Sequence, residues 1–376
     1  MAKLGDICDI LNGFAFKSEQ YVNDGIRIIR IANVQKGYVE DSTPVFYPID
    51  SKDAKKYSLE EDDILMSLTG NVGRVAKLSK EFLPAALNQR VACLRIKDGI
   101  AFDKAFLFNL LNSDYFEQQC IAASKGVAQK NMSTEWLKEY EIPMFSLEQQ
   151  KAIASVLDKV SELITLRKEQ LAKLDQLVKS RFIELFGDPM TNPKGFPCYT
   201  VGEVIDFQGG SQPDKKYFEY EPTPDNIRLI QIRDYKSDKY ITYIPRAMAK
   251  RFCTADDIMI GRYGPPIFQI LKGIEGSFNV ALMKATPKMG NREFVRQFLK
   301  QDCLLEYLEG LSKRTAGQDG IQMDKLKAYP FPYPPIELQE QFAAFVEQVD
   351  KSKFAVQKSL DKLETLKKAL MQKYFG

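Results

Sequence analysis

The stretch "QKNMSTEWLKEYEIPMFSLEQQKAIASVLDKV" (residues 129–160) decides the fold, because the chain contains a second version of it. That version is "QDGIQMDKLKAYPFPYPPIELQEQFAAFVEQV" (residues 318–349). The two copies align when the Phe-Gly pairs that follow them, Phe186-Gly187 and Phe375-Gly376, are placed over each other. The matched residues include Leu137 with Leu326, Lys138 with Lys327, Tyr140 with Tyr329, and Pro143 with Pro332. Such internal similarity predicts a duplicated structure.

The repeat continues towards the N-terminus, where loops of different length shift the alignment. "IRIIRIANV" (26–34) matches "IRLIQIRDY" (227–235), and "LEEDDILMS" (59–67) matches "CTADDIMIG" (253–261). "KLGDICDILNG" at the start matches "TVGEVIDFQGG" (200–210). A chain of 376 residues is also too long for one ordinary core. The sequence therefore predicts two similar units that have diverged unequally.

The first part of each unit has a mixed pattern. Runs such as "RIIRIANV", "DILMSL", "RVAKL" and "RVACLRI" are separated by Gly, Asn, Asp and Pro, as expected of strands joined by turns. One helix is expected over residues 102–123, opposite another over 293–311. The acidic pairs Asp62-Asp63 and Asp256-Asp257 precede apolar runs, so we expect turn and strand-entry residues there.

A long helix closes each unit. Prolines mark the boundary before it, Ser146-Leu147-Glu148-Gln149 is typical of an N-terminal cap, and a glycine follows each helix in the C-cap position. Apolar residues at alternating steps of three and four form a heptad seam, which predicts that the helices pack on each other. Two unrelated surface helices would leave this stripe exposed. The seam residues expected to pack are Ile153, Leu157, Val160, Leu171, Leu174, Phe342, Val346, Val349, Leu360 and Leu363.

Composition narrows the class of protein. Apolar residues make up 44% and charged residues 27% of the chain, as in soluble globular proteins. The sequence contains no run of eighteen apolar residues, so no membrane span is predicted. The first residues do not resemble a secretory signal. The six cysteines are scattered without a CxxC pair, so we expect buried free thiols in a reducing, cytoplasmic setting.

Catalytic signatures are missing. The absence of histidine excludes Ser-His-Asp and Cys-His centres, HNH nuclease centres and most catalytic zinc sites. The sequence has no Walker A motif, and it lacks the glycine-rich loop and the Asn/Asp-Pro-Pro-aromatic run of a DNA methyltransferase. A nuclease of the carboxylate-metal type needs an acidic residue followed by Glu-x-Lys, and the acidic pairs Asp62-Asp63 and Asp256-Asp257 have no such partner. With a net charge of only +3 the chain as a whole is barely basic. Any contact with nucleic acid must therefore come from local clusters of basic residues or from partner subunits.

Polar and basic loops recur at matching places in the two units. Glycine allows close backbone approach, while Arg, Asn and Gln carry the paired donors and acceptors that read base edges. Singly, each loop could be a plain hairpin turn; as duplicated sets they favour nucleic-acid binding. The candidates are Thr69, Gly70, Asn71, Arg74, Asn88, Gln89, Arg90, Lys125, Gln129 and Lys130 in the first unit, and Arg262, Tyr263, Gln269, Asn279, Lys313, Arg314 and Gln318 in the second.

The whole chain resembles the specificity (S) subunit of type I restriction-modification systems. "LGDICDILNGFAFKS", "IRIIRIANV" and "DDILMSLTGNVG" resemble a target recognition domain, and Lys17 in the first of these joins the DNA-binding candidates. "IPMFSLEQQKAIASVL" and "YPPIELQEQFAAFV" resemble the entries to the family's conserved helices, and "LFGDPMTNPKGF" resembles its linker. The second unit departs in "GRYGPPIFQI", which lacks the Thr-Gly of the first.

This resemblance implies an α+β architecture of two similar α/β target recognition domains, each followed by a long helix. The helices would form an antiparallel coiled coil with pseudo-twofold symmetry. The expected parts are recognition domain 1 (1–145), conserved helix 1 with the start of the linker (146–187), recognition domain 2 (188–335) and conserved helix 2 (336–376).

The resemblance further implies a non-catalytic subunit that reads a bipartite, asymmetric site in double-stranded DNA. Two methylation subunits would dock on the helices, and restriction subunits could join. S-adenosylmethionine, ATP and magnesium would belong to those partners, with no cofactor or metal in this chain. The alternatives are a protein-binding scaffold of a DNA-modifying complex without its own sequence readout, and a self-sufficient restriction or methylation enzyme. Shape-dependent readout leaves no motif, so the target bases stay open.

Overall fold

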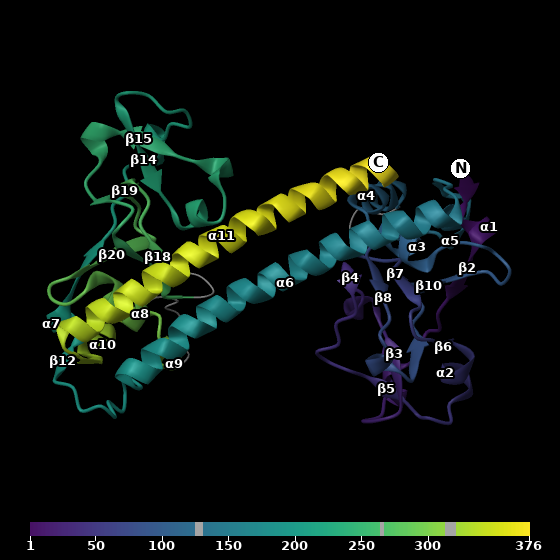
Figure 1. Ribbon diagram of the computed structural model, residues 1–376, viewed down its shortest axis with the longest axis horizontal. Helices are drawn as coiled ribbons and strands as arrows, with labels where there is room; N and C mark the ends of the chain where they lie inside the picture. The colour runs from purple at the N-terminus through teal and green to yellow at the C-terminus, as the bar shows by residue number, and fades with distance from the viewer. Residues whose placement is uncertain (125–130, 264–266, 313–320) are drawn as a thin grey trace. The chain divides into compact units, whose positions relative to one another are not determined.

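The computed structural model describes residues 1–124, 131–263, 267–312 and 321–376 (Figure 1). The chain forms two compact units, which are described separately. The first unit is Met1–Lys168 together with Lys358–Gly376, and the second is Glu169–Gln357. Each unit therefore contains one mixed domain and a part of both long helices.

The first unit contains two main sheets. Their strands are mostly antiparallel, with parallel pairing of β3 with β9 and of β4 with β8. A five-stranded sheet has the order β2 (Cys8–Asn12), β10 (Val91–Ile96), β7 (Ile64–Ser67), β8 (Val75–Lys77), β4 (Gly37–Tyr38). A four-stranded sheet has the order β5 (Phe46–Tyr47), β3 (Ile26–Ile29), β9 (Ala85–Leu87), β6 (Ser58–Leu59). β1 (Ala2–Lys3) pairs with β11 (Glu141–Ile142).

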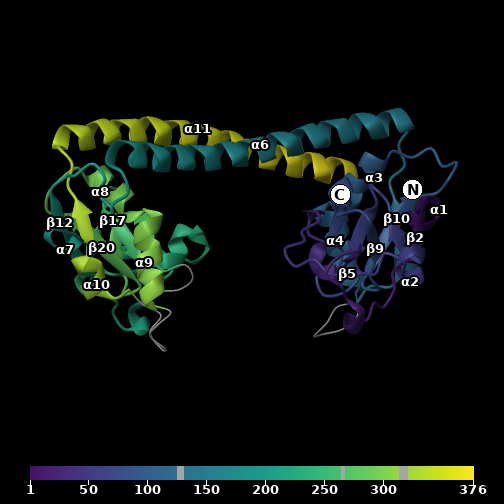
Figure 2. The same ribbon diagram turned by 90° about the horizontal axis from the view of Figure 1, so that it is seen from below.

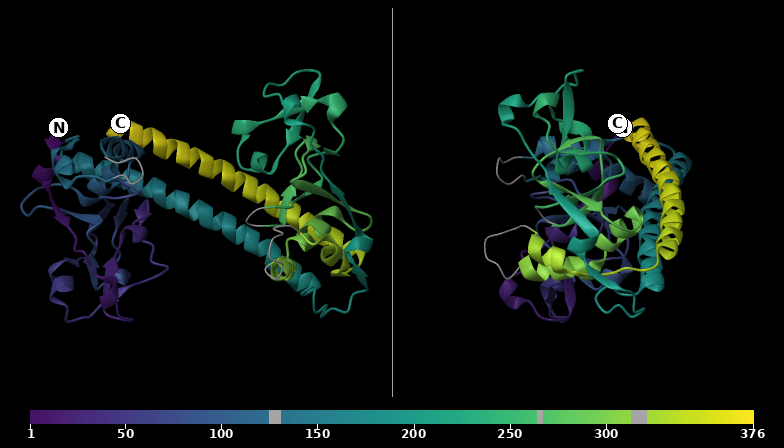
Figure 3. Two further views of the ribbon diagram at one scale, coloured as in Figure 1. Left: turned by 180° about the vertical axis from the view of Figure 1, so that it is seen from behind. Right: turned by 90° about the vertical axis from the view of Figure 1, so that its left-hand side faces the viewer.

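Over its described residues, the second unit repeats this topology without a counterpart of β4, which confirms the predicted duplication. Figure 3 shows the ribbon from two further sides, with the mixed domain of the second unit mainly in green. One sheet has the order β13 (Ile205–Gly209), β20 (Leu282–Pro287), β17 (Ile258–Gly261), β18 (Gln269–Lys272). The other has the order β15 (Tyr243–Pro245), β14 (Asn226–Ile230), β19 (Gly276–Phe278), β16 (Phe252–Cys253), with β14 and β19 parallel as in the first unit. β12 (Cys198–Thr200) pairs with β21 (Pro330–Pro332).

Shorter helices complete the two domains. In the first unit these are α1 (Leu4–Ile7), α2 (Lys52–Lys56), α3 (Lys104–Leu111), α4 (Asp114–Ala123) and α5 (Thr134–Glu139), with 3-10 turns η1 (Ser18–Gln20), η2 (Ile31–Asn33) and η3 (Lys80–Phe82). In the second they are α7 (Val201–Val204), α8 (Arg292–Leu299), α9 (Asp302–Ser312) and α10 (Met323–Ala328), with η4 (Lys215–Tyr217), η5 (Ile232–Tyr235), η6 (Asp238–Tyr240) and η7 (Arg246–Met248).

Both faces of the central sheet are covered, which explains why its strands read as unbroken apolar runs. Ile64 and Met66 of β7 pack with Phe106 of α3 in one core, whereas Leu65 packs with Ile29 of β3 in a second core. The alternation follows from the two-residue period of a strand. Buried free thiols occur as predicted at Cys8, Cys93, Cys120 and Cys253, while Cys303 is half-buried and Cys198 is exposed. Burial raises the pKa of the Cys8 thiol to about 12, so it stays protonated at neutral pH.

The single helix expected after the last strand of each sheet was wrong, because each is two helices. In the first unit the helix breaks at Asn112, and the Ser113 hydroxyl accepts the Phe116 N–H at 3.2 Å to start α4. In the second unit Lys300 ends α8 before α9 begins. Serine competes for backbone donors and favours N-cap positions, so Ser113 was the signal for the break.

The long helices are α6 (Leu147–Phe186) and α11 (Ile336–Phe375). Ser146 and Gln149 form a reciprocal cap: the Ser146 hydroxyl accepts the Gln149 N–H at 3.2 Å, and the Gln149 side chain accepts the Ser146 N–H at 3.0 Å. Gly187 has φ +75, and its N–H donates to the Ile183 carbonyl at 2.8 Å. A left-handed residue after the last turn ends α6, as the sequence indicated.

The two long helices pack antiparallel in each unit (Figure 2). In the first unit Ile153 shares a core with Phe375, and Lys168 pairs with Glu364 at 3.0 Å. In the second, Asp175 pairs with Lys353 at 2.5 Å, and the rings of Phe182 and Phe342 lie 5.6 Å apart. Residue numbers increase along α6 while those of the residues it contacts on α11 decrease. The helices therefore run antiparallel, which confirms the predicted pairing. Within the described ranges, no helix is long and apolar enough to cross a membrane.

Candidate nucleic-acid interface

The loop between β7 and β8 (residues 68–74) is a tight turn with an exposed tip. Gly70 and Gly73 have φ +73 and +84, a region that favours glycine. A Cβ on Gly73 would lie 2.8 Å from the Cβ of Cys120, so α4 closes the base of the loop. Thr69 is half-buried, while Gly70 and Asn71 are exposed. The loop therefore presents its tip to solvent on a fixed base.

Arg74 ends this loop and is held in one orientation. Its guanidinium donates to the Gln35 side-chain oxygen at 2.9 Å, and its backbone N–H donates to the Ser67 hydroxyl at 3.2 Å. Its partial exposure leaves the guanidinium accessible. An oriented guanidinium suits paired recognition of a base edge or a phosphate. Gln35, which orients it, was not among the predicted residues.

A second loop, residues 88–90, lies against the first. The Leu68 N–H donates to the Arg90 carbonyl at 3.0 Å, and the Asn88 side-chain oxygen closes the turn by accepting the Arg90 N–H at 3.3 Å. The side chains of Gln89 and Arg90 are exposed. The two loops therefore form one surface that carries Thr69, Gly70, Asn71, Arg74, Asn88, Gln89 and Arg90.

The segment that carries Lys17 begins beside this surface. Phe14 forms a bridge with Asn88, and a Cβ on Gly13 would lie 2.3 Å from the Asn88 backbone carbon. Lys17 itself is exposed, and its backbone N–H donates to the Tyr47 hydroxyl at 2.7 Å. Glycine is therefore needed at position 13 for the close approach of the two backbones.

In the second unit the corresponding loop joins β17 to β18. The Arg262 N–H donates to the Ala281 carbonyl at 2.9 Å, and its guanidinium lies 5.3 Å from the centre of the Tyr263 ring, which is 50% exposed. Gln269 is half-buried and pairs with Gly261 across the two strands. Arg262 and Tyr263 thus occupy the place of Leu68 and Thr69 in the first unit, with a different chemistry.

Asn279 forms the same turn as Asn88. Its side-chain oxygen accepts the Ala281 N–H at 3.1 Å, and its backbone N–H donates to the Ile230 carbonyl at 3.0 Å, as that of Asn88 does to Ile29 at 3.2 Å. Asn279 is only 7% exposed, and its amide nitrogen lies 3.5 Å from the Gln212 side-chain oxygen. In both turns the asparagine oxygen shapes the loop beside the interface.

Six of the predicted residues lie outside the described part of the chain: Lys125, Gln129, Lys130, Lys313, Arg314 and Gln318. The described chain resumes at Asn131, which forms a bridge with Thr69, and the Met132 N–H donates to the Leu68 carbonyl at 2.8 Å. The segment after residue 130 therefore begins at the 68–74 loop.

A polar cavity beside the second-unit loop was missed from the sequence. It is lined by Tyr220, Glu221, Pro222, Arg233, Asp238, Lys239, Tyr240, Ile241 and Tyr243. The Arg233 guanidinium donates to the Thr242 hydroxyl at 3.1 Å and lies 5.8 Å from the centre of the exposed Tyr240 ring. Its neighbour Ile232 adjoins Gly261, where a Cβ would lie 2.9 Å from the Ile232 methyl. The alternation of basic and aromatic residues in 233–240 was the available signal, since cations and aromatic faces together suit nucleic acid.

Two buried glutamines attach the domains to the long helices, and these too were missed. Gln150 of α6 accepts the Asp103 N–H at 2.8 Å and donates to the Phe145 carbonyl at 2.8 Å. Gln339 of α11 accepts the Asn291 N–H at 2.8 Å and donates to the Pro334 carbonyl at 2.8 Å. Their exposures are 1% and 0%. The repeated Glu-x-Gln pattern after the proline boundary, Glu148-Gln149-Gln150 and Glu337-Leu338-Gln339, was compatible with them but did not reveal their partners.

We expect Gln339→Leu to lower the free energy of unfolding by about 1–3 kcal/mol, because a buried N–H and a buried carbonyl would lose their partner. Urea denaturation checks this. The matched control is Gln341→Leu at an exposed position of the same helix, expected to change stability by less than about 0.5 kcal/mol. Equal effects of the two variants would show that the Gln339 bridge does not stabilise the unit.

The acidic pairs are turn and strand-entry residues, as predicted. Asp63 accepts the Glu60 N–H at 2.8 Å, and Asp257 accepts the Thr254 N–H at 2.9 Å at the matching turn. The Arg95 guanidinium donates two bonds of 2.7 Å to Asp63. Across the described ranges, no group of three or more acidic or cysteine side chains is arranged to hold a metal ion.

Five of the proposed seam residues pack in the cores of the two units: Ile153, Leu157, Phe342, Val346 and Val349. Ile153, Leu157, Val160, Phe342, Val346, Val349 and Leu360 are buried, whereas Leu171, Leu174 and Leu363 are half-buried. Charged residues such as Lys353 and Lys367 interrupt the seam. Burial, together with the nearby charge of Lys168, lowers the pKa of Lys367. Lys353 is compensated by its pair with Asp175.

The comparison with known protein families also divides the chain into two segments. The family described as "Type I restriction modification DNA specificity domain" matches residues 1–176 and 193–367. The chain is 31% identical over 186 residues to the MjaVIII specificity subunit of Methanocaldococcus jannaschii, covering 48% of this chain but only 43% of that protein. It is 21% identical over 413 aligned residues to the EcoKI specificity subunit of Escherichia coli K12, covering 100% and 88%.

The fold is also that of a solved relative. The S subunit of a type I restriction-modification system from M. genitalium superimposes with a TM-score of 0.60 at 18% sequence identity, covering 100% of this chain and 95% of that one. Since both matched segments of the family model lie on the two repeated units described above, the chain belongs to the type I restriction-modification DNA specificity family.

Proposed function

We propose that this chain is the DNA-reading subunit of a type I restriction-modification complex. Each domain reads one half of a bipartite, asymmetric target, and the chain directs partner methylation and restriction subunits to it. The observation that carries the proposal is the repeated pair of loops: residues 68–74 with 88–90 in the first unit, and the described residues 262–263 and 267–268 with 279–281 in the second. These loops follow matching strands in two sheets whose first four strands have the same order, but they carry different side chains.

Different side chains on one scaffold are what two different half-sites require. Thr69, Asn71 and Arg74 offer hydroxyl, amide and guanidinium groups, whereas Arg262 and Tyr263 offer a cation stacked near an aromatic ring. Arginine pairs with guanine and asparagine with adenine in the major groove, while tyrosine stacks or donates a single bond. The two domains therefore prefer different bases, which makes the whole site asymmetric.

The chain itself performs no chemistry in this proposal. Methyl transfer and cleavage, with S-adenosylmethionine, ATP and magnesium, belong to two methylation subunits and to restriction subunits. The supporting observation is the lack of histidine together with the missing nucleotide and methyl-donor motifs. The paired helices α6 and α11 offer exposed faces to such partners, including Leu163, Leu166, Phe354 and Leu366.

The test is a binding competition with the complex assembled from this chain and its methylation subunits. Labelled random duplexes are selected, sequenced and re-measured at fixed salt, because affinity for DNA is meaningless without the salt concentration. The proposal expects enrichment of two short sequences separated by unread bases. A scaffold without readout would enrich nothing.

Arg262→Ala tests the second domain. We expect weaker binding by about 1–3 kcal/mol for the selected site, with relaxed preference at one or two positions of a single half-site. The measurement is competition against duplexes changed one base pair at a time. The matched control is Arg292→Ala, an exposed arginine at the start of α8, which should leave both half-sites unchanged. A loss that is uniform over all duplexes would make Arg262 a phosphate contact instead.

A further inference from the structure

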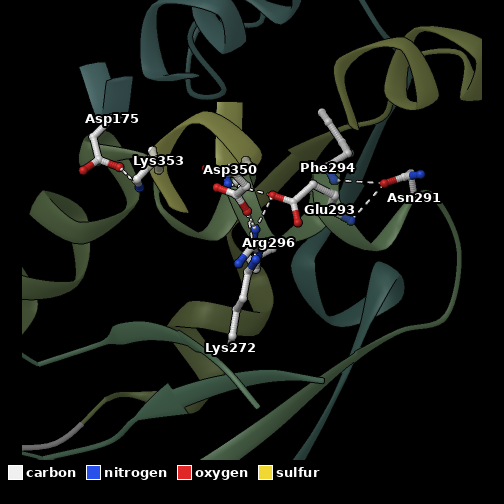
Figure 4. Close-up of polar contacts among 9 residues, drawn as sticks. Asp175, Lys272, Asn291, Glu293, Phe294, Arg296, Asp350 and Lys353 are labelled. Atoms are coloured by element: carbon white, nitrogen blue, oxygen red, sulfur yellow. Dashed lines mark hydrogen bonds and ion pairs between the residues drawn. The ribbon is translucent and has the colours of Figure 1, made fainter. Parts of the chain in front are cut away.

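A charged cluster ties the second recognition domain to helix α11 (Figure 4). Asp350 on α11 pairs with Lys272 at 2.8 Å and lies 3.6 Å from the guanidinium of Arg296 on α8. Arg296 also donates to Glu293 at 2.6 Å. Val349, next to Asp350, packs into the main core of the unit, so the carboxylate stands at the edge of that contact. We refer to Asp350, Lys272 and Arg296 as the Asp350 clamp.

The clamp is partly withdrawn from water. Arg296 is 6% exposed, and its Nε has no hydrogen-bond partner among the described residues, so Asp350 and Glu293 supply its main compensation. Partial burial of Asp350 opposes ionisation, but the hydrogen bond and charge of Lys272, with the charges of Arg296 and Lys353, hold its pKa below the ordinary value. Asp350 is therefore charged at neutral pH, and removing it would leave a buried cation undercompensated.

Lys272 connects the clamp to the candidate interface. It is the last residue of β18, and Gln269, the first, pairs with Gly261 of β17. The loop between these strands carries Arg262 and Tyr263. One strand of four residues thus runs from the reading loop to the ion pair with α11, a length of about 10 Å. At one end this strand is joined to α11 by the ion pair of Lys272 with Asp350.

In the described part of the first unit the Asp350 clamp has no counterpart, because the matching residues have other partners. Lys77, the last residue of β8, pairs with Asp62 in a turn of its own sheet at 2.8 Å. The residue that aligns with Asp350 is Ser161, whose hydroxyl donates to the Leu157 carbonyl at 2.8 Å within α6. Besides Gln150, α6 is linked to its domain there by Asp158, which accepts a hydrogen bond from Asn109 of α3 at 2.8 Å. No ion pair between α6 and β8 is present among the described residues of that unit.

We propose that Asp350 is a positioning residue: through Lys272 it fixes β18, and so the reading loop of the second domain, to helix α11. Loss of the clamp then relaxes sequence discrimination at the second half-site and leaves the first unchanged. This inference rests on the proposed DNA-reading function. It adds a mechanical link from the helix pair to one half of the readout.

The experiment compares Asp350→Asn and Lys272→Gln with the matched control Lys77→Gln, each in the full chain assembled with its methylation subunits. Lys272 and Lys77 are both well exposed at their side chains, 61% and 50%, so neither change threatens folding. Discrimination is the ratio of affinities for the selected duplex and for a duplex with one changed base pair in a chosen half. Asp350→Glu is included as the conservative variant.

We expect both clamp variants to lower discrimination in the second half about tenfold, to leave the first half within about twofold, and Asp350→Glu to restore most of the loss. Lys77→Gln should change neither half. An equal change in both halves, no change, or a uniform loss of affinity for all duplexes, which is the mark of a lost phosphate contact, would overturn the inference. If the unmodified complex shows no sequence preference, the proposed function fails first, and the two failures are thereby distinguished.

Discussion

Replacing residues 1–145 by the equivalent domain of a relative with a different target is expected to change one half of the recognised site completely and the other half not at all. The physical reason is that the first domain has its own sheets, its own loop surface and one core formed by its residues alone, around Ile29 and Leu65. The measurement is mapping of methylated positions in DNA exposed to the assembled complex.

The junction before Ser146 suits such an exchange. Gln150 holds the domain through the backbone N–H of Asp103, a contact that does not depend on the side chain of the incoming domain. Two side chains that the donor domain must supply are an aromatic residue in place of Phe106, whose ring lies 5.4 Å from that of Phe375, and an amide in place of Asn109, which donates to Asp158 of α6 at 2.8 Å. The control is a donor with the same target, which should leave the site unchanged. Changes in both halves after the first exchange would contradict separate readers.

Phe182→Ala is expected to lower the free energy of unfolding by about 3–5 kcal/mol. Phe182 is 1% exposed, and its ring lies 5.0 Å from Phe186, 5.7 Å from Phe294 and 5.6 Å from Phe342. These rings come from α6, α8 and α11, so one cavity would loosen the helix pair and the recognition domain together. Urea denaturation followed by circular dichroism measures the loss.

The matched control for this change is Phe354→Ala on α11. Phe354 is 73% exposed, so its removal should change stability by less than about 0.5 kcal/mol. A loss at Phe354 as large as that at Phe182 would mean that the aromatic cluster is not what holds the helices to the domain.

Local signals in the sequence were sufficient for the repeat and for the two long helices. The Ser146 cap, the Gly187 terminus and the heptad spacing act within one or two turns, and each is found where it was predicted. The turns at Asp63 and Asp257 are equally local. The break at Asn112-Ser113 was missed because apolar periodicity continued through it, although the serine itself was visible.

Contacts between distant residues could not be read in the same way. Gln339 meets Asn291, and Asp350 meets Lys272, only because the fold brings α11 against the domain. The pattern of polar residues on a helix face does not distinguish these from solvated positions. The loops at 68–74 and 88–90 were predicted separately, but their contact through Leu68 and Arg90 depends on strand order. The cavity around Arg233 and Tyr240 depends on it as well, because η5 must lie beside Gly261.

The central claim is that two similar domains of one chain each read a different short sequence. The most direct measurement is sequencing of the duplexes that the assembled complex selects from a random pool. The account predicts two unlike sequence blocks separated by a fixed number of unread base pairs. A single continuous block, two identical blocks, or a pool left at random would contradict it.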